Sequence, residues 1–308
     1  MRTHGYGDPT VAAGEGGPSE PPVTEIGYSR RSPSSGITVQ FWGVRGSLPC
    51  AEPQLARYGG NTSCVEVRCG ERLLIFDAGT GLRPLGTRLA QSSRRTDADL
   101  FFSHFHIDHV CGLPFFSPMY DASTRIRFWA GNLLPSRRIV QAIGQMMSEP
   151  LFPLGPDSFR ASIEYHDFYA GDVLKPHPGL TLRTAALNHP GGATGYRLEF
   201  GRGALAYITD TEHRPGALDK NVLELARNVD LMIYDCNYTD QEYPDHIGWG
   251  HSTWQHGVLL ARAAGAKLLA IFHHDPEHDD EQLDSIGREA KKQHPHTVVA
   301  AEGMMLRF

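Results

Sequence analysis

Four residues that can bind a metal ion lie within six positions of the chain: His104, His106, Asp108 and His109. They follow the apolar run 100–102, which is typical of a short buried strand. If the backbone stays extended through His106, the two-residue spacing places His104 and His106 on the same side. Burying three imidazoles and a carboxylate without partners would be costly. The pattern therefore predicts a metal site, for which zinc is the first choice and iron or manganese the alternatives.

The pattern His-x-His-x-Asp-His after a strand resembles the signature of the metallo-β-lactamase superfamily of binuclear metallohydrolases. In that family the first two histidines bind one metal ion, and the aspartate and the last histidine bind the second. The resemblance implies a cofactor of two divalent metal ions, with Zn²⁺ favoured over Mn²⁺ or Fe²⁺. It also implies the fold, an α/β four-layer αβ/βα sandwich with the metals at the strand ends.

Three later residues match the remaining ligands of the family. A strand-like segment ends at His189, before a Pro-Gly-Gly turn, where the family has its third histidine. Another ends at Asp210, where the family has a carboxylate that bridges both metals. The strand predicted for 267–272 ends at His273, with His274 as the alternative offset by one. The resemblance thus implies seven metal ligands: His104, His106, Asp108, His109, His189, Asp210 and His273.

Asp77 ends the predicted strand 73–76 and precedes a glycine-rich turn. A carboxylate in this place can cap a helix, here the one predicted for residues 82–91. The resemblance offers a second role, because the family has an Asp-x-Gly there whose carboxylate supports the metal ligands. Both roles remain open at the level of the sequence.

Two further motifs narrow the branch of the superfamily. His251-Ser252-Thr253 before a predicted helix resembles the tRNase Z-like phosphodiesterases, and residues 104–118 resemble the signature of class II cyclic-nucleotide phosphodiesterases. The first resemblance implies that His251 donates a proton to the leaving group. Asp235 stands where that branch has glutamate, and we expect it to orient His251. We assign the catalytic roles to His251, Asp235 and the metal ligand Asp108.

These residues favour a binuclear, zinc-dependent phosphodiesterase that acts on a small or cyclic phosphodiester through a metal-bridging hydroxide. The alternative is a hydrolase with the same metals that attacks a carbonyl group, such as a thioesterase, a lactonase or a β-lactamase. It stays open because the fold does not determine the substrate. A metal-stabilised binding module is the third hypothesis, and a complete ligand set argues against it.

The composition limits the partners that we expect. The net charge is −6 over 308 residues, and no long basic arm is present, so the chain does not suggest a protein that grips long nucleic acids. No apolar run is long enough to span a membrane. The five cysteines form no C-x-x-C pair, which favours a reduced, cytoplasmic protein. Dimers are common in the superfamily, so a homodimer is the assembly to test.

The predicted domain organisation has two parts. Residues 1–36 are rich in Gly, Pro, Ser and Thr, and they predict a disordered leader. Residues 37–308 predict the hydrolase domain, strand-rich in its first half and alternating between strand and helix in its last third.

Overall fold

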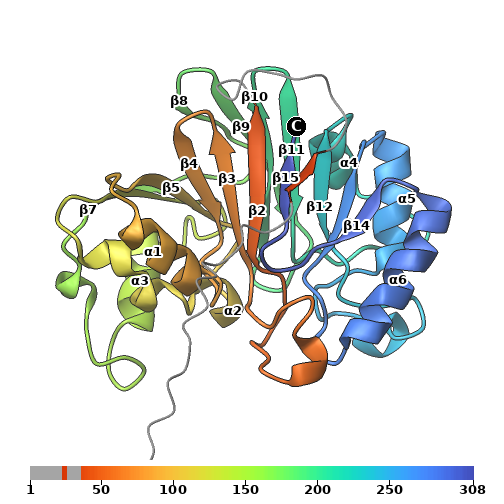
Figure 1. Cartoon of the computed structure of the whole chain (residues 1–308), viewed down its shortest axis with the longest axis horizontal. Coiled ribbons are helices and arrows are strands. Elements are labelled where there is room, and N and C mark those ends of the chain that lie inside the picture. Colours follow the sequence, from red (N-terminus) through yellow and green to blue (C-terminus); the bar gives the residue numbers. More distant parts are fainter. Residues whose placement is uncertain (1–22, 26–35) are drawn as a thin grey trace, which may run out of the picture.

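The computed structural model describes residues 23–25 and 36–308, which form two mixed β-sheets packed face to face (Figure 1). The first sheet has the order β1-β15-β2-β3-β4-β5-β6-β7. Its strands are β1 (Val23–Glu25), β15 (Met305–Arg307), β2 (Ile37–Gly43), β3 (Cys64–Cys69), β4 (Arg72–Phe76), β5 (Asp97–Phe102), β6 (Arg125–Ala130) and β7 (Ser162–Asp167).

The second sheet has the order β14-β13-β12-β11-β10-β9-β8. Its strands are β14 (Thr297–Val299), β13 (Leu269–Phe272), β12 (Leu231–Asp235), β11 (Gly203–Ile208), β10 (Ala193–Phe200), β9 (Leu180–Leu187) and β8 (Val173–His177).

Helices cover the outer face of each sheet, as Figure 1 shows. Beside the first sheet lie α1 (Leu82–Gln91), α2 (Ile107–Val110) and α3 (Ile139–Met146). Beside the second lie α4 (Lys220–Ala226), α5 (Trp254–Ala264) and α6 (Asp280–Gln293). Short 3₁₀ helices occupy loops: η1 (Pro53–Leu55), η2 (Leu113–Phe115), η3 (Ser117–Tyr120), η4 (Pro156–Ser158) and η5 (Tyr243–His246). None of the helices in the described ranges is long and apolar enough to cross a membrane.

Three apolar layers hold this arrangement together. Between the sheets lies a core rich in aromatic rings, among them Phe41, Phe76 and Tyr207. A second core joins the outer face of β10–β14 to α4–α6, and a third joins β3–β7 to α1–α3. Two sheets back to back with helices outside are the αβ/βα sandwich, so the predicted fold class is confirmed.

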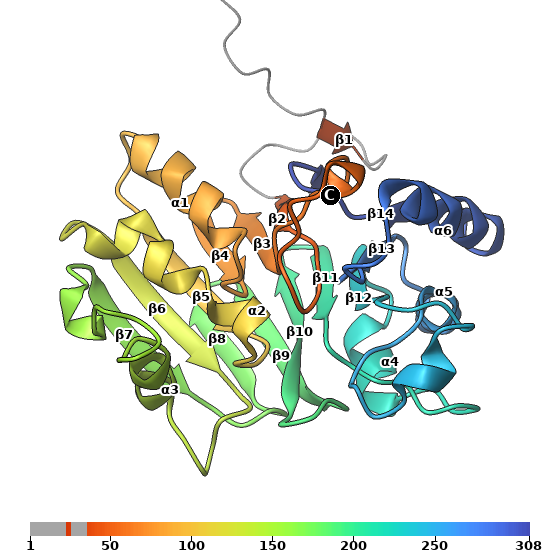
Figure 2. The ribbon, with the colours of Figure 1, turned by 90° about the horizontal axis from the view of Figure 1, so that it is seen from below.

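The strand directions explain where the site forms. Strands β4 to β7 are parallel to one another, and so are β11 to β14. The carboxyl ends of parallel strands meet at the same edge of a sheet, and ligands bind there in open α/β sheets. Figure 2, turned to look from below, brings the edge that carries α2 toward the reader.

Some elements differ from those that the sequence predicts. Helix α4 and strands β8 and β15 were not predicted. Most of the predicted disordered leader lies outside the described residues, whereas Val23–Glu25 within it form β1, parallel to β15. The capping alternative for Asp77 is wrong, because α1 begins after Gly81 and no side chain caps it.

Candidate metal centre

Five of the seven predicted ligands come from loops that follow strands at one edge of the sandwich, and the other two, Asp108 and His109, lie on α2. His104 and His106 follow β5, and His106 is the residue that precedes α2. His189, Asp210 and His273 come shortly after β9, β11 and β13. Of these, Asp210 (φ 55°) and His273 (φ 62°) have left-handed backbone conformations. A non-glycine residue in that region carries a strain of about 1–3 kcal/mol, and such strain gathers at functional sites.

Three imidazoles form a group that we call the histidine group: His104, His106 and His189. Their ring nitrogens lie within 4.8 Å of one another. His189 Nε2 lies 3.0 Å from His106 Nδ1, and His104 Nε2 is buried with no hydrogen-bond partner among the described residues. Burial lowers the pKa of all three imidazoles, so they are neutral at pH 7. Neutral imidazole is the form that binds a metal ion.

The other four predicted ligands form the acid–histidine group: Asp108, His109, Asp210 and His273. His109 Nε2 lies 3.1 Å from Asp108 Oδ2, and His273 Nε2 lies 3.4 Å from the same oxygen. Burial alone would raise the pKa of Asp108, but His109 outweighs it and the pKa is lowered. His109 and His273 likewise lower the pKa of Asp210 despite its burial, and the carboxylates raise the pKa of His109. Both carboxylates are therefore charged and need positive charge beside them, which a protonated His109 or a metal ion in place of its proton supplies.

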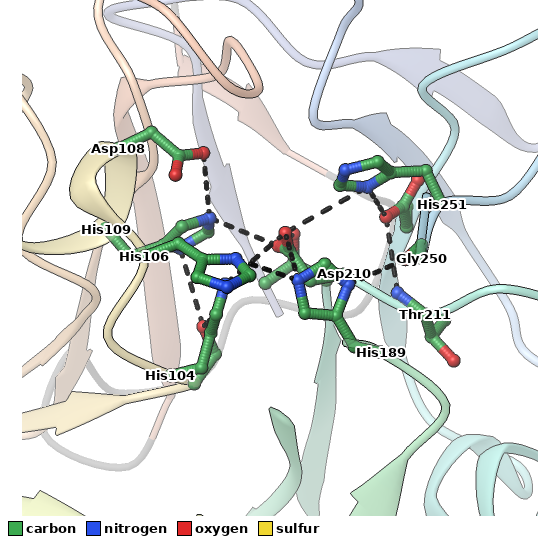
Figure 3. Close-up of polar contacts among 12 residues, drawn as sticks. His104, His106, Asp108, His109, His189, Asp210, Thr211, Gly250 and His251 are labelled. Atoms are coloured by element: carbon green, nitrogen blue, oxygen red, sulfur yellow. Dashed lines mark hydrogen bonds and ion pairs between the residues drawn. The ribbon is translucent and has the colours of Figure 1, made fainter. Parts of the chain in front are cut away.

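Asp210 lies between the two groups, with one carboxylate oxygen toward each (Figure 3). Its Oδ1 is 3.7 Å from His104 Nε2 and 3.8 Å from His189 Nε2. Its Oδ2 is 3.2 Å from His109 Nε2 and 3.4 Å from His273 Nε2. This is the arrangement expected of a carboxylate shared by two neighbouring cation sites.

The donor set fits the divalent ions that the resemblance implies. Each group offers imidazole nitrogens together with the Asp210 carboxylate, the mixture that zinc accepts and that iron or manganese tolerates. Nε2 of His104 agrees with this: it is buried without a hydrogen-bond partner among the described residues, and Asp210 Oδ1 lies 3.7 Å away from it.

A layer of hydrogen bonds fixes the ligands. Asp77 Oδ2 lies 2.8 Å from His109 Nδ1 and accepts from Ser103 Oγ and Tyr207 OH at 2.7 and 2.8 Å. His189 Nδ1 donates to the carbonyl oxygen of Gly250 at 2.9 Å. These contacts engage Nδ1 of His109 and of His189 and leave Nε2 of both rings for a metal, as partners of metal-bound histidines do. Asp77 thus contacts a predicted metal ligand, His109, as its second predicted role, support of the metal ligands, requires.

Gly250 shows how tightly this layer is packed. Its φ is 90°, and a Cβ added there would lie 2.2 Å from His189 Nδ1. No side chain fits at that distance, so the position requires glycine.

The predicted proton donor lies beside the two groups. His251 Nδ1 lies 2.9 Å from Asp235 Oδ2 and 3.9 Å from Asp210 Oδ1. The backbone N–H groups of Thr211, Asn237 and Ser252 also donate to Asp235. Asp235 is therefore well placed to orient His251, and it leaves Nε2 of that ring available for other contacts.

Glu212 is a residue at this site that the sequence analysis missed. Its carboxylate accepts the backbone N–H groups of Gly248 and Gly250 at 2.9 Å each. It thus holds the loop whose Gly250 carbonyl orients His189 and whose next residue is His251. Its position two residues after Asp210 is the one sequence signal that could have found it.

The adjacent residues His273 and His274 point in different directions. His273 belongs to the acid–histidine group, and Asn237 Nδ2 donates to its carbonyl oxygen at 2.9 Å. His274 Nε2 instead donates to the carbonyl oxygen of Ala300 at 2.8 Å, and burial lowers the pKa of His274 to about 3. The ring of His274 therefore belongs to the packing around the site.

This geometry separates the effects of two single substitutions. We expect His273→Ala to lower the bound metal from about two equivalents to about one, because the acid–histidine group loses a ligand. His274→Ala should keep both equivalents and lower the melting temperature, because it leaves a cavity in a packed region. Elemental analysis and thermal unfolding of both variants measure this. If His274→Ala loses metal and His273→Ala does not, the ligand is His274.

The fold and the site define a hydrolase of the metallo-β-lactamase fold. The sequence profile of the Beta-lactamase superfamily domain matches residues 72–274, and the chain belongs to this superfamily. Ribonuclease Z of Myxococcus xanthus is 24% identical over 303 residues, covering 84% of this chain and 94% of that protein. Ribonuclease Z of Haloarcula marismortui is 25% identical over 328 residues, covering 88% and 96%. The resemblance to the tRNase Z-like branch is thus supported along most of the chain.

Solved structures show the same fold. The metallo-β-lactamase fold protein YhfI from Bacillus subtilis superposes with a TM-score of 0.66 at 17% identity, covering 89% of this chain and all of that one. A diphosphatase from the PhnP family gives 0.64 at 18% identity, covering 89% and 97%. The short form of human tRNase Z gives 0.60 at 18% identity, covering 87% and 98%.

Proposed function

We propose that this protein is a metal-dependent phosphodiesterase that acts on a small or cyclic phosphodiester. The observation that carries the proposal is His251, held by Asp235 beside the shared carboxylate of Asp210. Cleavage of a phosphodiester needs a proton for the leaving oxygen, and an imidazole in this place can provide it. The relatives named ribonuclease Z support the same class of bond, because cleavage of RNA breaks a phosphodiester. The structural neighbour named a diphosphatase acts on a related bond between phosphorus and oxygen.

The proposed mechanism assigns a task to each set of residues. The histidine group and the acid–histidine group would each hold one metal ion, with Asp210 facing both. Such ions, when bound, supply an activated water and stabilise negative charge on the phosphoryl oxygens. A water molecule gives up a proton to solvent, and its oxygen forms a bond to phosphorus while the bond to the leaving oxygen breaks. His251 Nε2 gives its proton to that oxygen, and Asp235 keeps the ring in position through Nδ1.

The electrostatics around His251 agree with a proton donor. Burial alone would lower its pKa, but the Asp235 carboxylate outweighs burial and raises the pKa to about 9. The imidazole is then protonated at neutral pH, which is the form that a general acid requires.

A panel of substrates tests the reaction class. Protein purified without a chelator should hydrolyse bis(4-nitrophenyl) phosphate and a cyclic nucleotide faster than a lactone, a thioester or nitrocefin. It should act slowly on 4-nitrophenyl phosphate, because a phosphate monoester carries two negative charges and the proposed site binds a diester with one. Removal of metal by a chelator should abolish each activity. Rapid hydrolysis of nitrocefin or the thioester, without any phosphodiesterase activity, would favour the carbonyl-directed alternative.

The names of the relatives make RNA the second phosphodiester to test. The chain carries a net charge of −6, and contacts along a polynucleotide normally require a basic surface. We therefore expect kcat/KM for an RNA oligonucleotide to fall below that for the small diesters. The opposite order would make RNA the substrate and leave the reaction class unchanged.

A further inference from the structure

A pocket of about 490 Å³ lies directly beside the acid–histidine group. Its walls come from the loop after β2, the start of α1, and the segment from α2 to η2. Asp108 belongs both to the lining of this pocket and to the acid–histidine group. A phosphodiester bound at the metal centre would therefore have one of its two substituents next to the pocket.

Three large apolar side chains of the lining are exposed to an unusual degree. Leu48, Ile107 and Phe115 all line the pocket, and their exposed fractions are 61%, 63% and 57%. Exposed apolar residues that gather at one place often mark a binding site. Phe115 packs edge to face against Phe152, with ring centroids 5.8 Å apart, which limits its movement. These surfaces fit a flat or branched apolar group.

The same lining contains one cationic residue, Arg83, in the first turn of α1. Its guanidinium makes no hydrogen bond or ion pair within residues 36–308. Asp108, the one acid of the lining, is already engaged by His109, His273 and the backbone N–H of Ser47. Arg83 is thus available for an anionic group on a ligand.

The position of the proton donor decides which substituent enters the pocket. In Figure 3, Asp108 and His251 lie on opposite sides of Asp210. The leaving oxygen must approach His251, so the pocket beside Asp108 faces the substituent that stays on phosphorus.

We propose that this pocket is a specificity subsite for the retained substituent of the substrate, an aromatic group that carries a carboxylate or another anion. Leu48, Ile107 and Phe115 contact the ring, and Arg83 binds the anion. The proposal rests on the phosphodiesterase function and adds the chemistry of the substrate to it.

Three diesters with one common leaving group test this subsite: methyl, phenyl and 4-carboxyphenyl 4-nitrophenyl phosphate. Each releases 4-nitrophenolate, so rates differ only through the retained group. We expect Phe115→Ala to reduce the preference for phenyl over methyl by about tenfold, because the ring loses its apolar contact. Arg83→Gln should reduce the preference for the carboxyphenyl over the phenyl diester by about tenfold. It should leave the preference for the phenyl over the methyl diester unchanged. Leu259→Ala, an exposed apolar position on α5, is the matched control.

A binding measurement separates the subsite from the reaction. Cys111 lines the pocket and Cys50 does not, although both are partly exposed. Methyl (4-carboxybenzyl)phosphonate serves as an analogue of the substrate. It should slow the alkylation of Cys111 by iodoacetamide in the wild type and slow it less in Arg83→Gln. The alkylation of Cys50 should not change in either protein.

The outcomes distinguish the two proposals. Turnover with preferences unchanged in both variants would overturn the subsite and leave the phosphodiesterase function intact. Protection of Cys111 without turnover of any diester would support the pocket as a binding site and overturn the phosphodiesterase function. Absence of both turnover and protection would overturn both.

Discussion

His251→Ala is expected to lower kcat for phosphodiesters by about 10²–10⁴-fold, the usual contribution of general acid catalysis. The side chain is not among the seven predicted ligands, and its Nδ1 is engaged by Asp235 at 2.9 Å. Metal content and melting temperature should therefore stay close to those of the wild type. Steady-state kinetics, elemental analysis and thermal unfolding of the same preparation measure all three.

The dependence on the leaving group distinguishes a proton donor from a structural residue. The defect should be largest for an alkyl leaving group and smallest for 4-nitrophenolate, which needs little protonation to depart. Asp235→Asn should show a milder form of the same pattern, because it weakens the orientation of the ring. His296→Ala, at an exposed position, is the control. Loss of metal in His251→Ala, or an equal defect for both leaving groups, would contradict the proton-donor role.

The sequence was most informative where the chemistry is local. His104, His106, Asp108 and His109 lie within six positions, so strand, spacing and residue types together predicted a cluster. The structure brings all four into the two groups. His189 was found differently, because a lone histidine before a turn is uninformative without the resemblance to the family.

The features that sequence analysis missed depend on contacts between distant segments. Glu212 contacts Gly248 and Gly250, which lie 36 and 38 positions later in the chain, and no local sequence pattern predicts such a hydrogen bond. Asp77 had two plausible roles, and only the fold brings it to His109, 32 positions away.

Helix α4 is a different case, because its signals were present. Asp219 accepts the N–H groups of Asn221 and Val222, and the spacing of Val222 and Leu225 is helical. The helix is only seven residues long, and so short a periodic pattern is easily overlooked.

Asp210→Ala should have the largest effect of any single substitution at the centre. Its Oδ1 faces His104 and His189, and its Oδ2 faces His109 and His273. Removing it takes a ligand from both groups at once, so metal content should fall from about two equivalents to below one. Because the metals supply several kcal/mol of transition-state stabilisation, kcat should fall by about 10³-fold or more. Titration of chelator-treated protein with Zn²⁺ and kinetics at saturating metal measure both effects.

The comparison with His189→Ala makes this prediction specific to a shared carboxylate. That variant removes a ligand from the histidine group alone, so it should keep about one equivalent of metal. Asp157→Ala, at an exposed position, should keep the wild-type content. If Asp210→Ala retains one tightly bound equivalent and loses no more metal than His189→Ala, Asp210 serves only one site. A maximum of one equivalent in the wild type would count against a binuclear centre altogether.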